Sequence, residues 1–280
     1  MKNAMQLKAV VKNIAKEKGI SAILVLQNYM LERFLERVSL SPYRNSFIIK
    51  GGFLIASMVG LDSRTTKDLD ATIKGYPVSA ESIQKMTEEI LSVRVDDNIS
   101  FSFKSIGEIR EDDEYAGFRV ALTADYESMA VPIKLDITTG DKITPAEIRY
   151  DYKLMLEDRC ISVLAYNLPT ILAEKLETVI SRSDQNTRPR DYYDIFILTR
   201  LQAENIDFGV LKEALRSTAE KRGSMEVVRH YREVMRVVRN SETMISRWDN
   251  YRKDFDYAAG IGFEETCDTI IEIMERIQGI

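Results

Sequence analysis

The chain has 280 residues, of which 45% are hydrophobic and 30% are charged, and its formal net charge is −5. These proportions are typical of a folded globular protein that is long enough for one large domain or two smaller ones. A single histidine, His230, excludes two-histidine zinc sites and the His-Glu-x-x-His metalloprotease motif, and Cys160 and Cys267 are too far apart for a Cys-x-x-Cys zinc or redox site.

The N-terminal segment favours a cytoplasmic protein. Residues 1–19 are charged throughout and lack the apolar core of a signal peptide. No run of the sequence approaches the ~20 apolar residues that span a bilayer. We therefore expect no contact with a membrane and, from the sparse cysteines, a reducing compartment.

The first half of the chain mixes helical and strand patterns. The spacing of apolar residues predicts helices over 4–18, 22–38, 53–59 and 79–92. A short apolar run covers 46–50, and strands are predicted over 66–73, 99–106, 117–124 and 131–138, with an acidic turn at 111–114.

After about residue 150 the strand pattern ends. Helices are predicted over 168–182, 189–201, 208–222, 225–240 and 262–277. Strands with helices followed by helices alone predict an α/β domain and then an all-helical domain. We place these domains at 1–155 and 156–280.

Paired acidic residues lie on two of the predicted strands. Asp68 and Asp70 share one strand face because successive side chains alternate, and Lys134 and Asp136 do the same on a later strand. If the two strands are neighbours, three carboxylates converge in the ligand set that a two-metal site needs, and Mg²⁺ prefers such oxygen ligands. A lone Asp-x-Asp is common on solvated strands, so the prediction depends on the combination.

A glycine pair, Gly51 and Gly52, lies between the apolar run and the next helix. Free N–H groups at the positive end of a helix dipole, without a nearby Cβ, let a triphosphate approach closely. The simpler alternative is an ordinary turn.

The helical half carries a lysine where an apolar residue is expected. Lys175 falls inside the apolar arc of helix 168–182, where an ammonium needs a partner. Its side chain either extends along the surface to water or reaches a cleft between the domains and binds nucleotide phosphate. Asp191 and Asp194 share one face of the next helix, close to its N-terminus, where capping is the simpler role.

Together these motifs resemble the nucleotidyltransferase superfamily of DNA polymerase β and, more closely, the AbiEii/AbiGii toxin family, over most of residues 47–200. Gly52, Asp68 and Asp70 match the first family motif, and Lys134 with Asp136 matches the second. Many superfamily members have serine where this chain has Gly52, so a hydroxyl contact to the terminal phosphate is not available there.

Two further motifs extend the resemblance into the helical half. Ala-Glu-Lys175-Leu resembles the third family motif, and Arg190-Asp191-Tyr-Tyr-Asp194 resembles the fourth. By that resemblance Arg190, Asp191 and Asp194 shape the active site or hold Lys175 in place.

The resemblance implies a nucleotidyltransferase-like mixed sheet with helices, followed by an all-helical C-terminal domain. The catalytic residues it implies are Asp68, Asp70, Asp136, Lys175, Asp191 and Asp194. The nucleotide-binding residues it implies are Gly51, Gly52, Thr66, Lys134, Lys175 and Arg190. Asp68, Asp70 and Asp136 are the expected ligands of Mg²⁺ or Mn²⁺, and an NTP is the expected substrate.

The family consists of toxins of bacterial toxin–antitoxin and phage-abortive-infection systems, some of which modify tRNA 3′ ends and so block aminoacylation. The resemblance therefore implies a type IV toxin that transfers a nucleoside monophosphate to tRNA and has a cognate antitoxin as its partner. Transfer to a protein or a small molecule, and NTP binding without turnover, remain alternatives.

One predicted helix has a basic face. In 225–240, Val227, Tyr231, Val234 and Val238 form one side, and the arginines Arg229, Arg232, Arg236 and Arg239 lie within an arc of ~80° on the other. Residues 215–240 hold seven Lys or Arg against three Glu. This face is either simply solvated or a sequence-independent contact for RNA phosphates.

Overall fold

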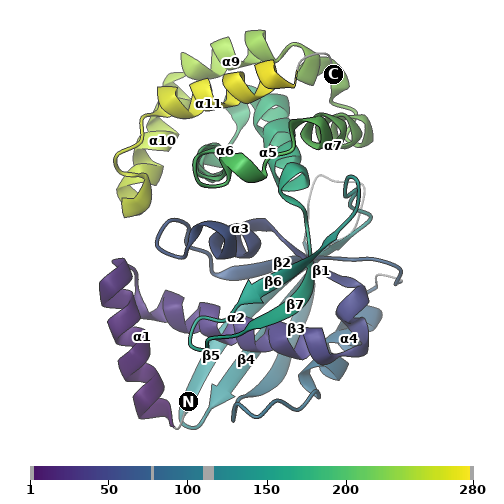
Figure 1. Cartoon of the computed structure of the whole chain (residues 1–280), viewed down its shortest axis with the longest axis vertical. Helices are drawn as coiled ribbons and strands as arrows, with labels where there is room; N and C mark the ends of the chain where they lie inside the picture. The colour runs from purple at the N-terminus through teal and green to yellow at the C-terminus, as the bar shows by residue number, and fades with distance from the viewer. Residues whose placement is uncertain (1–2, 77–78, 110–116, 278–280) are drawn as a thin grey trace. The chain divides into compact units, whose positions relative to one another are not determined.

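The computed structural model describes residues 3–76, 79–109 and 117–277 (Figure 1). The chain divides into two compact units, the first of residues 1–141 and 147–165 and the second of residues 142–146 and 166–280. All strands of the described ranges lie in the first unit. The acidic turn expected at 111–114 lies outside the described residues.

The first unit is built on a seven-stranded mixed sheet with the strand order β3-β4-β5-β2-β1-β7-β6. Its strands are β1 (Phe47–Lys50), β2 (Asp68–Ile73), β3 (Ser100–Ile109), β4 (Gly117–Tyr126), β5 (Met129–Thr139), β6 (Ile148–Lys153) and β7 (Cys160–Ala165). β2 pairs in parallel with β5, and β1 pairs in parallel with β7, whereas the other pairs are antiparallel.

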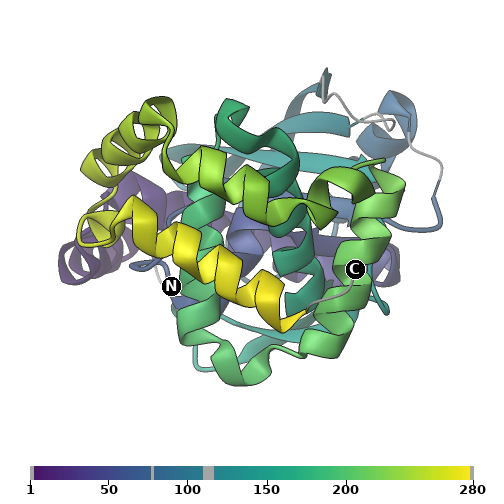
Figure 2. The same cartoon turned by 90° about the horizontal axis from the view of Figure 1, so that it is seen from above.

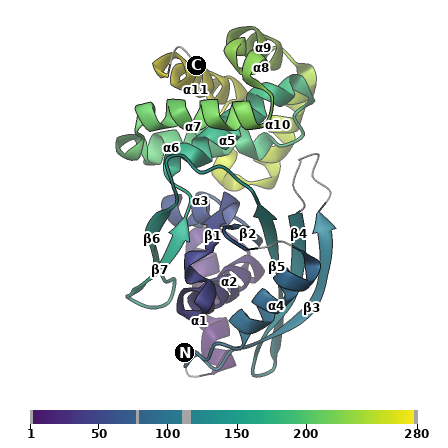
Figure 3. The same cartoon turned by 90° about the vertical axis from the view of Figure 1, so that its right-hand side faces the viewer.

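Helices cover one face of this sheet (Figures 1 and 3). They are α1 (Ala4–Lys18), α2 (Ala22–Leu40), α3 (Gly51–Val59) and α4 (Ala80–Leu91). α2 packs on the sheet through Phe34, whose ring contacts Phe47 of β1 and Phe101 of β3, and α1 packs on α2. Leu69 and Leu135 share this buried face. Because strand side chains alternate, their neighbours Asp68, Asp70 and Asp136 lie on the opposite face.

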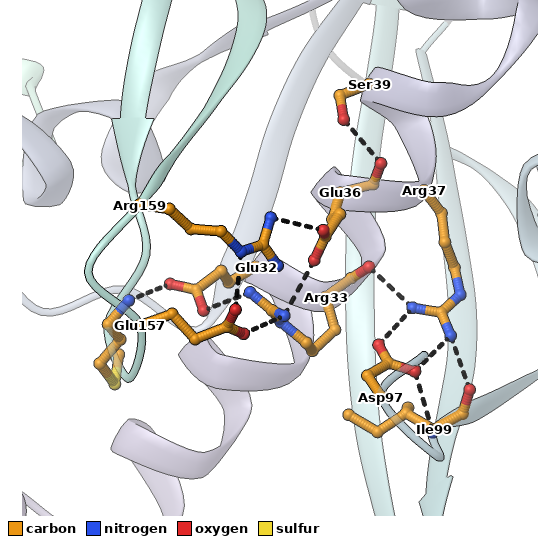
Figure 4. Close-up of polar contacts among 10 residues, drawn as sticks. Glu32, Arg33, Glu36, Arg37, Ser39, Asp97, Ile99, Glu157 and Arg159 are labelled. Atoms are coloured by element: carbon orange, nitrogen blue, oxygen red, sulfur yellow. Dashed lines mark hydrogen bonds and ion pairs between the residues drawn. The ribbon is translucent and has the colours of Figure 1, made fainter. Parts of the chain in front are cut away.

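Helix α2 buries charged side chains rather than only apolar ones. Arg33, whose side chain is 1% exposed, forms ion pairs with Glu32 at 2.9 Å, Glu36 at 2.9 Å and Glu157 at 2.8 Å (Figure 4). The second oxygen of Glu32 accepts a hydrogen bond from the backbone N–H of Met155 at 2.6 Å. Burial raises the pKa of Glu32 to about 7, although the positive charge of Arg33 lowers it.

A second buried pair follows one turn later on α2. Both guanidinium ends of Arg37 donate to Asp97, at 2.8 and 2.9 Å, and one also donates to the backbone oxygen of Ile99 at 2.6 Å (Figure 4). The two clusters fasten α2 to the β6–β7 hairpin and to the segment before β3. Such pairs are costly to break because the remaining charge stays buried.

The second unit is helical (Figure 2). Its helices are α5 (Leu168–Arg182), α6 (Pro189–Leu201), α7 (Phe208–Lys221), α8 (Met225–Arg229), α9 (Tyr231–Arg239), α10 (Glu242–Asp254) and α11 (Phe263–Arg276). α5 packs against α6 and α7, and α11 packs against α6 and α9. Aromatic rings from α6, α10 and the start of α11, among them Tyr192, Trp248 and Phe263, form part of the core. None of the helices in the described ranges is both long and apolar enough to cross a bilayer.

Three sequence-based expectations about secondary structure were wrong. The β pattern does not end at about residue 150, because β6 and β7 complete the sheet; β6 alternates Ile148, Tyr150 and Tyr152 with polar residues in the period of a strand. Residues 225–240 form two helices separated at His230, which caps both, and α10 was not predicted at all.

Candidate active site

A glycine turn joins β1 to α3. Gly51 has φ +65°, and a Cβ at this position would overlap the Oδ2 atom of Asp70. Both the left-handed backbone and the close carboxylate therefore require glycine here. The backbone N–H of Gly52 donates to the same Oδ2 of Asp70 at 3.2 Å. The start of α3 thus holds one of the predicted metal ligands.

The residues around Gly52 leave little free space. A Cβ on Gly52 would lie 3.1 Å from Thr66 Oγ1 and 3.2 Å from Arg64 Nη2. The hydroxyl of Thr66 donates to the backbone oxygen of Asp68 at 3.1 Å, and Arg64 is 6% exposed. Thr66 is one of the predicted nucleotide-binding residues, and Arg64 is a positive neighbour that the sequence reasoning missed.

The aspartates lie in register on neighbouring strands. Asp70 of β2 is the direct partner of Asp136 of β5, and Asp68 is the partner of Lys134. Because paired residues project from the same face of a sheet, Asp68, Asp70 and Asp136 share the face opposite α2. The condition under which three carboxylates converge, namely that the two strands are neighbours, is therefore met.

This row of paired residues continues on both sides. Lys50 of β1 is the partner of Asp70, and Arg119 of β4 is the partner of Asp136. We call Lys50, Asp70, Asp136 and Arg119 the charged row: two carboxylates with a cation at each end. Cross-strand neighbours of opposite charge stabilise a sheet, whereas the two adjacent carboxylates repel each other.

The outer cations have carboxylate partners. Arg119 forms a two-pronged ion pair with Asp136, from Nε to Oδ1 at 2.7 Å and from Nη2 to Oδ2 at 2.6 Å. Lys50 Nζ lies 2.7 Å from Oδ2 of Asp141, which also accepts a hydrogen bond from Thr138 at 2.8 Å. The hydrogen bond and charge of Asp136 raise the pKa of Arg119, and the charges of Asp68 and Asp70 add to the effect.

Sequence reasoning also missed Arg119 and Lys50. Arg119 could have been noticed as a single cation on the polar side of an alternating strand. Its pairing with Asp136, however, depends on the register between β4 and β5. Lys50 was not among the predicted site residues.

The chemistry of the face fits a divalent cation. Carboxylate oxygens are the hard ligands that Mg²⁺ prefers, and the three side chains lie on adjacent strands. Within the ranges that the structure describes, no group of three or more His, Cys, Asp or Glu side chains is already gathered around one point. At this face both carboxylate oxygens of Asp136 accept hydrogen bonds from Arg119, and Asp70 accepts a hydrogen bond from the backbone N–H of Gly52.

Lys175 lies in the second unit and has two carboxylate partners. Its Nζ is 2.7 Å from Oδ1 of Asp191 and 2.7 Å from Oδ2 of Asp194, and the Asp194 side chain is fully buried. Burial acts to lower the pKa of Lys175, but the two carboxylates outweigh it and the pKa lies above its ordinary value. The ammonium is thus held charged between the two aspartates instead of extending to water. Arg190 is exposed on the first turn of α6.

The second unit contains a buried acid on α5. Glu177 is 3% exposed and accepts hydrogen bonds from Arg222 at 2.5 Å and from Ser224 at 2.7 Å. This network ties the segment between α7 and α8 to α5. A glutamate at this position gave no sequence signal because its partners lie 45 or more residues away.

The predicted basic face is divided and partly neutralised. Arg229 lies 3.8 Å from Glu226, Arg232 lies 3.5 Å from Glu275 of α11, and Arg239 pairs with Asp268 of α11. Because the helix is interrupted at His230, the buried side consists of Val228, Tyr231, Met235 and Val238, and Val227 is exposed. The arginines therefore do not form one continuous bare ridge.

Comparison with known proteins connects these features to a family. Solved structures that resemble the chain include JHP933 from Helicobacter pylori, with 14% identity, a TM-score of 0.48 and coverage of 92% of this chain and 94% of that one. Another is an antigenic nucleotidyltransferase-like protein from Paracoccidioides brasiliensis, with 17% identity, a TM-score of 0.37 and coverage of 80% and 92%.

These structural likenesses are distant, and comparison with curated proteins finds no match. The sequence profile of the family described as "Nucleotidyl transferase AbiEii toxin, Type IV TA system" matches residues 33–271, a span that includes the charged row and Lys175. The chain belongs to the AbiEii family of nucleotidyltransferase toxins of type IV toxin–antitoxin systems.

Proposed function

We propose that the charged row and Asp68 bind an NTP with a divalent cation and transfer its nucleoside monophosphate to an acceptor hydroxyl. The observation that carries this proposal is that Asp70 and Asp136 are direct partners on neighbouring strands. The Asp70 carboxylate also lies so close to residue 51 that only glycine fits there. Asp68, Asp70 and Asp136 would hold Mg²⁺ or Mn²⁺, which supplies positive charge to the triphosphate and polarises its α-phosphate.

The residues of the chain have distinct tasks in this reaction. The acceptor oxygen forms a bond to the α-phosphorus, the bond from that phosphorus to the bridging oxygen breaks, and pyrophosphate leaves with the bonding electrons. Asp136 is our candidate acceptor for the hydroxyl proton. The backbone at Gly51 and Gly52, at the start of α3, is our candidate contact for the phosphates, and Thr66 and Lys134 are further candidates.

Lys175 is the proposed phosphate ligand of the second unit. Asp191 and Asp194 keep its ammonium charged and fixed in a buried position. A fixed cation stabilises charge on a leaving pyrophosphate better than a mobile one, because it needs no reorganisation. Arg190 is the second candidate for nucleotide contact from this unit.

We propose the 3′ end of tRNA as the acceptor, because it is the acceptor implied by the resemblance to this toxin family, and a cognate antitoxin as the binding partner. RNA binding by Arg229, Arg232, Arg236 and Arg239 is expected to be weaker than the sequence alone indicates, because three of the four arginines have acidic partners. Contacts to phosphate of this kind weaken steeply with salt.

The test is incubation of the purified protein with each labelled NTP, Mg²⁺ and total tRNA. We expect label in the tRNA with one or more of the four nucleotides. Asp70→Asn should abolish the transfer, whereas Asp62→Asn, which changes an exposed aspartate paired with Lys18, should leave it intact.

Other results would select an alternative. Label in added protein or in a small molecule, with none in tRNA, would keep the nucleotidyl transfer and reject the RNA acceptor. Stoichiometric NTP binding without release of pyrophosphate would reject turnover and favour a nucleotide-binding role.

A further inference from the structure

Arg119 lies beside the two adjacent carboxylates of the charged row, where a positive charge offsets their repulsion. It faces Asp136 in register, and its guanidinium engages both oxygens of that carboxylate. The arginine side chain is 48% exposed while Asp136 is 17% exposed, so the guanidinium shields the carboxylate from water. Such a two-pronged pair fixes the orientation of the carboxylate as well as its charge.

The ion pair conflicts with metal binding by the same carboxylate. A divalent cation bound to Asp136 would lie close to the guanidinium, and like charges at such distances repel strongly where water is partly excluded. A guanidinium cannot lose its proton to relieve this repulsion. The side chain must therefore move away when a cation binds, and its partial exposure leaves it free to do so.

We propose that Arg119 is a positioning residue that acts as the counter-ion of the acidic cluster in the metal-free protein and competes with the divalent cation for Asp136. This inference rests on the proposed function, because it assumes that the cluster binds a metal. Arg119 keeps the repelling carboxylates folded on neighbouring strands before the cation arrives, and it weakens metal binding until the cation displaces it.

The test is titration of metal-stripped, full-length protein with MnCl₂ by isothermal calorimetry, together with thermal unfolding in the absence and presence of Mn²⁺. Arg119→Met removes the competitor, so we expect Mn²⁺ to bind about tenfold more tightly or better, which corresponds to about 1.4 kcal/mol. The same variant should unfold at a lower temperature than the parent protein without metal and show a larger rise in Tm when Mn²⁺ is added.

Two control variants make the result specific. Arg119→Lys keeps a positive charge but not the two-pronged geometry, so it should bind Mn²⁺ more tightly than the parent protein. This variant takes the place of Arg119→Met in the test if Arg119→Met does not fold. Lys104→Met removes a positive charge from an exposed position on the adjacent strand β3 and should leave the Mn²⁺ affinity within about twofold of the parent.

The outcomes separate this inference from the proposed function. If the parent and Arg119→Met bind Mn²⁺ equally, and Asp70→Asn removes the binding, the metal site stands and the role of Arg119 is overturned. If neither protein binds Mn²⁺, both proposals fail. Weaker Mn²⁺ binding by Arg119→Met would also overturn the inference, because it would show that Arg119 strengthens metal binding instead of competing with the cation.

Discussion

The buried acid on α2 makes the stability of this protein depend on pH near neutrality. Glu32 is 1% exposed, and burial raises its pKa from 4.5 to about 7 despite the charge of Arg33 beside it. A carboxyl whose folded-state pKa is raised binds its proton more tightly in the folded than in the unfolded chain. Its contribution is therefore fully present below pH 4.5 and is lost as the pH rises to about 7.

The magnitude follows from the size of that interval. At about 1.4 kcal/mol per pH unit, the raised pKa corresponds to a loss of about 3 kcal/mol of unfolding free energy between the two ends of the interval. Glu32→Gln removes the titration and keeps an oxygen that can accept the N–H of Met155. The unfolding free energy of the variant should equal that of the parent protein near pH 5 and exceed it at pH 8.

Urea unfolding followed by circular dichroism at pH 5, 6, 7 and 8 measures this difference. His230, whose pKa is raised by the backbone oxygen of Glu226, is present in both proteins, so its titration cancels in the comparison. Asp62→Asn is the matched control. The hydrogen bond from Lys18 lowers the pKa of Asp62, so the contribution of Asp62 to stability is lost only as the pH falls through the acid range. A difference between Glu32→Gln and the parent that stays constant from pH 5 to 8 would refute the reasoning, since it would mean that Arg33 keeps Glu32 ionised throughout.

Two further substitutions test other parts of the account. Gly51→Ala places a Cβ on the Asp70 carboxylate and should abolish nucleotide transfer in the tRNA assay. Gly19 is the matched control, because it has the same φ of +65° but no neighbour within 4 Å of a Cβ. Gly19→Ala should therefore cost about 1 kcal/mol of stability and keep full activity. Lys175→Met leaves Asp194 buried without its cation and should lower the unfolding free energy by about 3–5 kcal/mol in denaturant titrations; an unchanged midpoint would show that the ion pair is not what holds α5 to α6.

Local patterns were enough to predict the elements that carry the aspartates. Alternation on β2 and β5 placed Asp68 with Asp70 and Lys134 with Asp136, and the apolar residues after the glycine pair predicted α3, whereas the run at 46–50 was not predicted to be a strand. These predictions succeed because the period of a strand and the conformational freedom of glycine are properties of a few adjacent residues.

Features that depend on partners distant in the sequence could not be predicted in this way. The pairing of Arg119 with Asp136 needs the register of β4 on β5, and the burial of Glu177 needs Arg222 from the segment between α7 and α8. The break at His230 also changed which residues of α8 and α9 are buried. For Arg119 and Glu177 the tertiary partner, rather than the local sequence, decides where the charged side chain lies.

The position of the label in the NTP tests the central claim most directly. Parallel reactions with α-³²P- and γ-³²P-labelled NTP, Mg²⁺ and tRNA should place the α label in RNA and the γ label in released pyrophosphate, and Asp70→Asn should give neither product. Transfer of the γ label to the acceptor, or full activity of the Asp70→Asn protein, would contradict nucleotidyl transfer by the three aspartates.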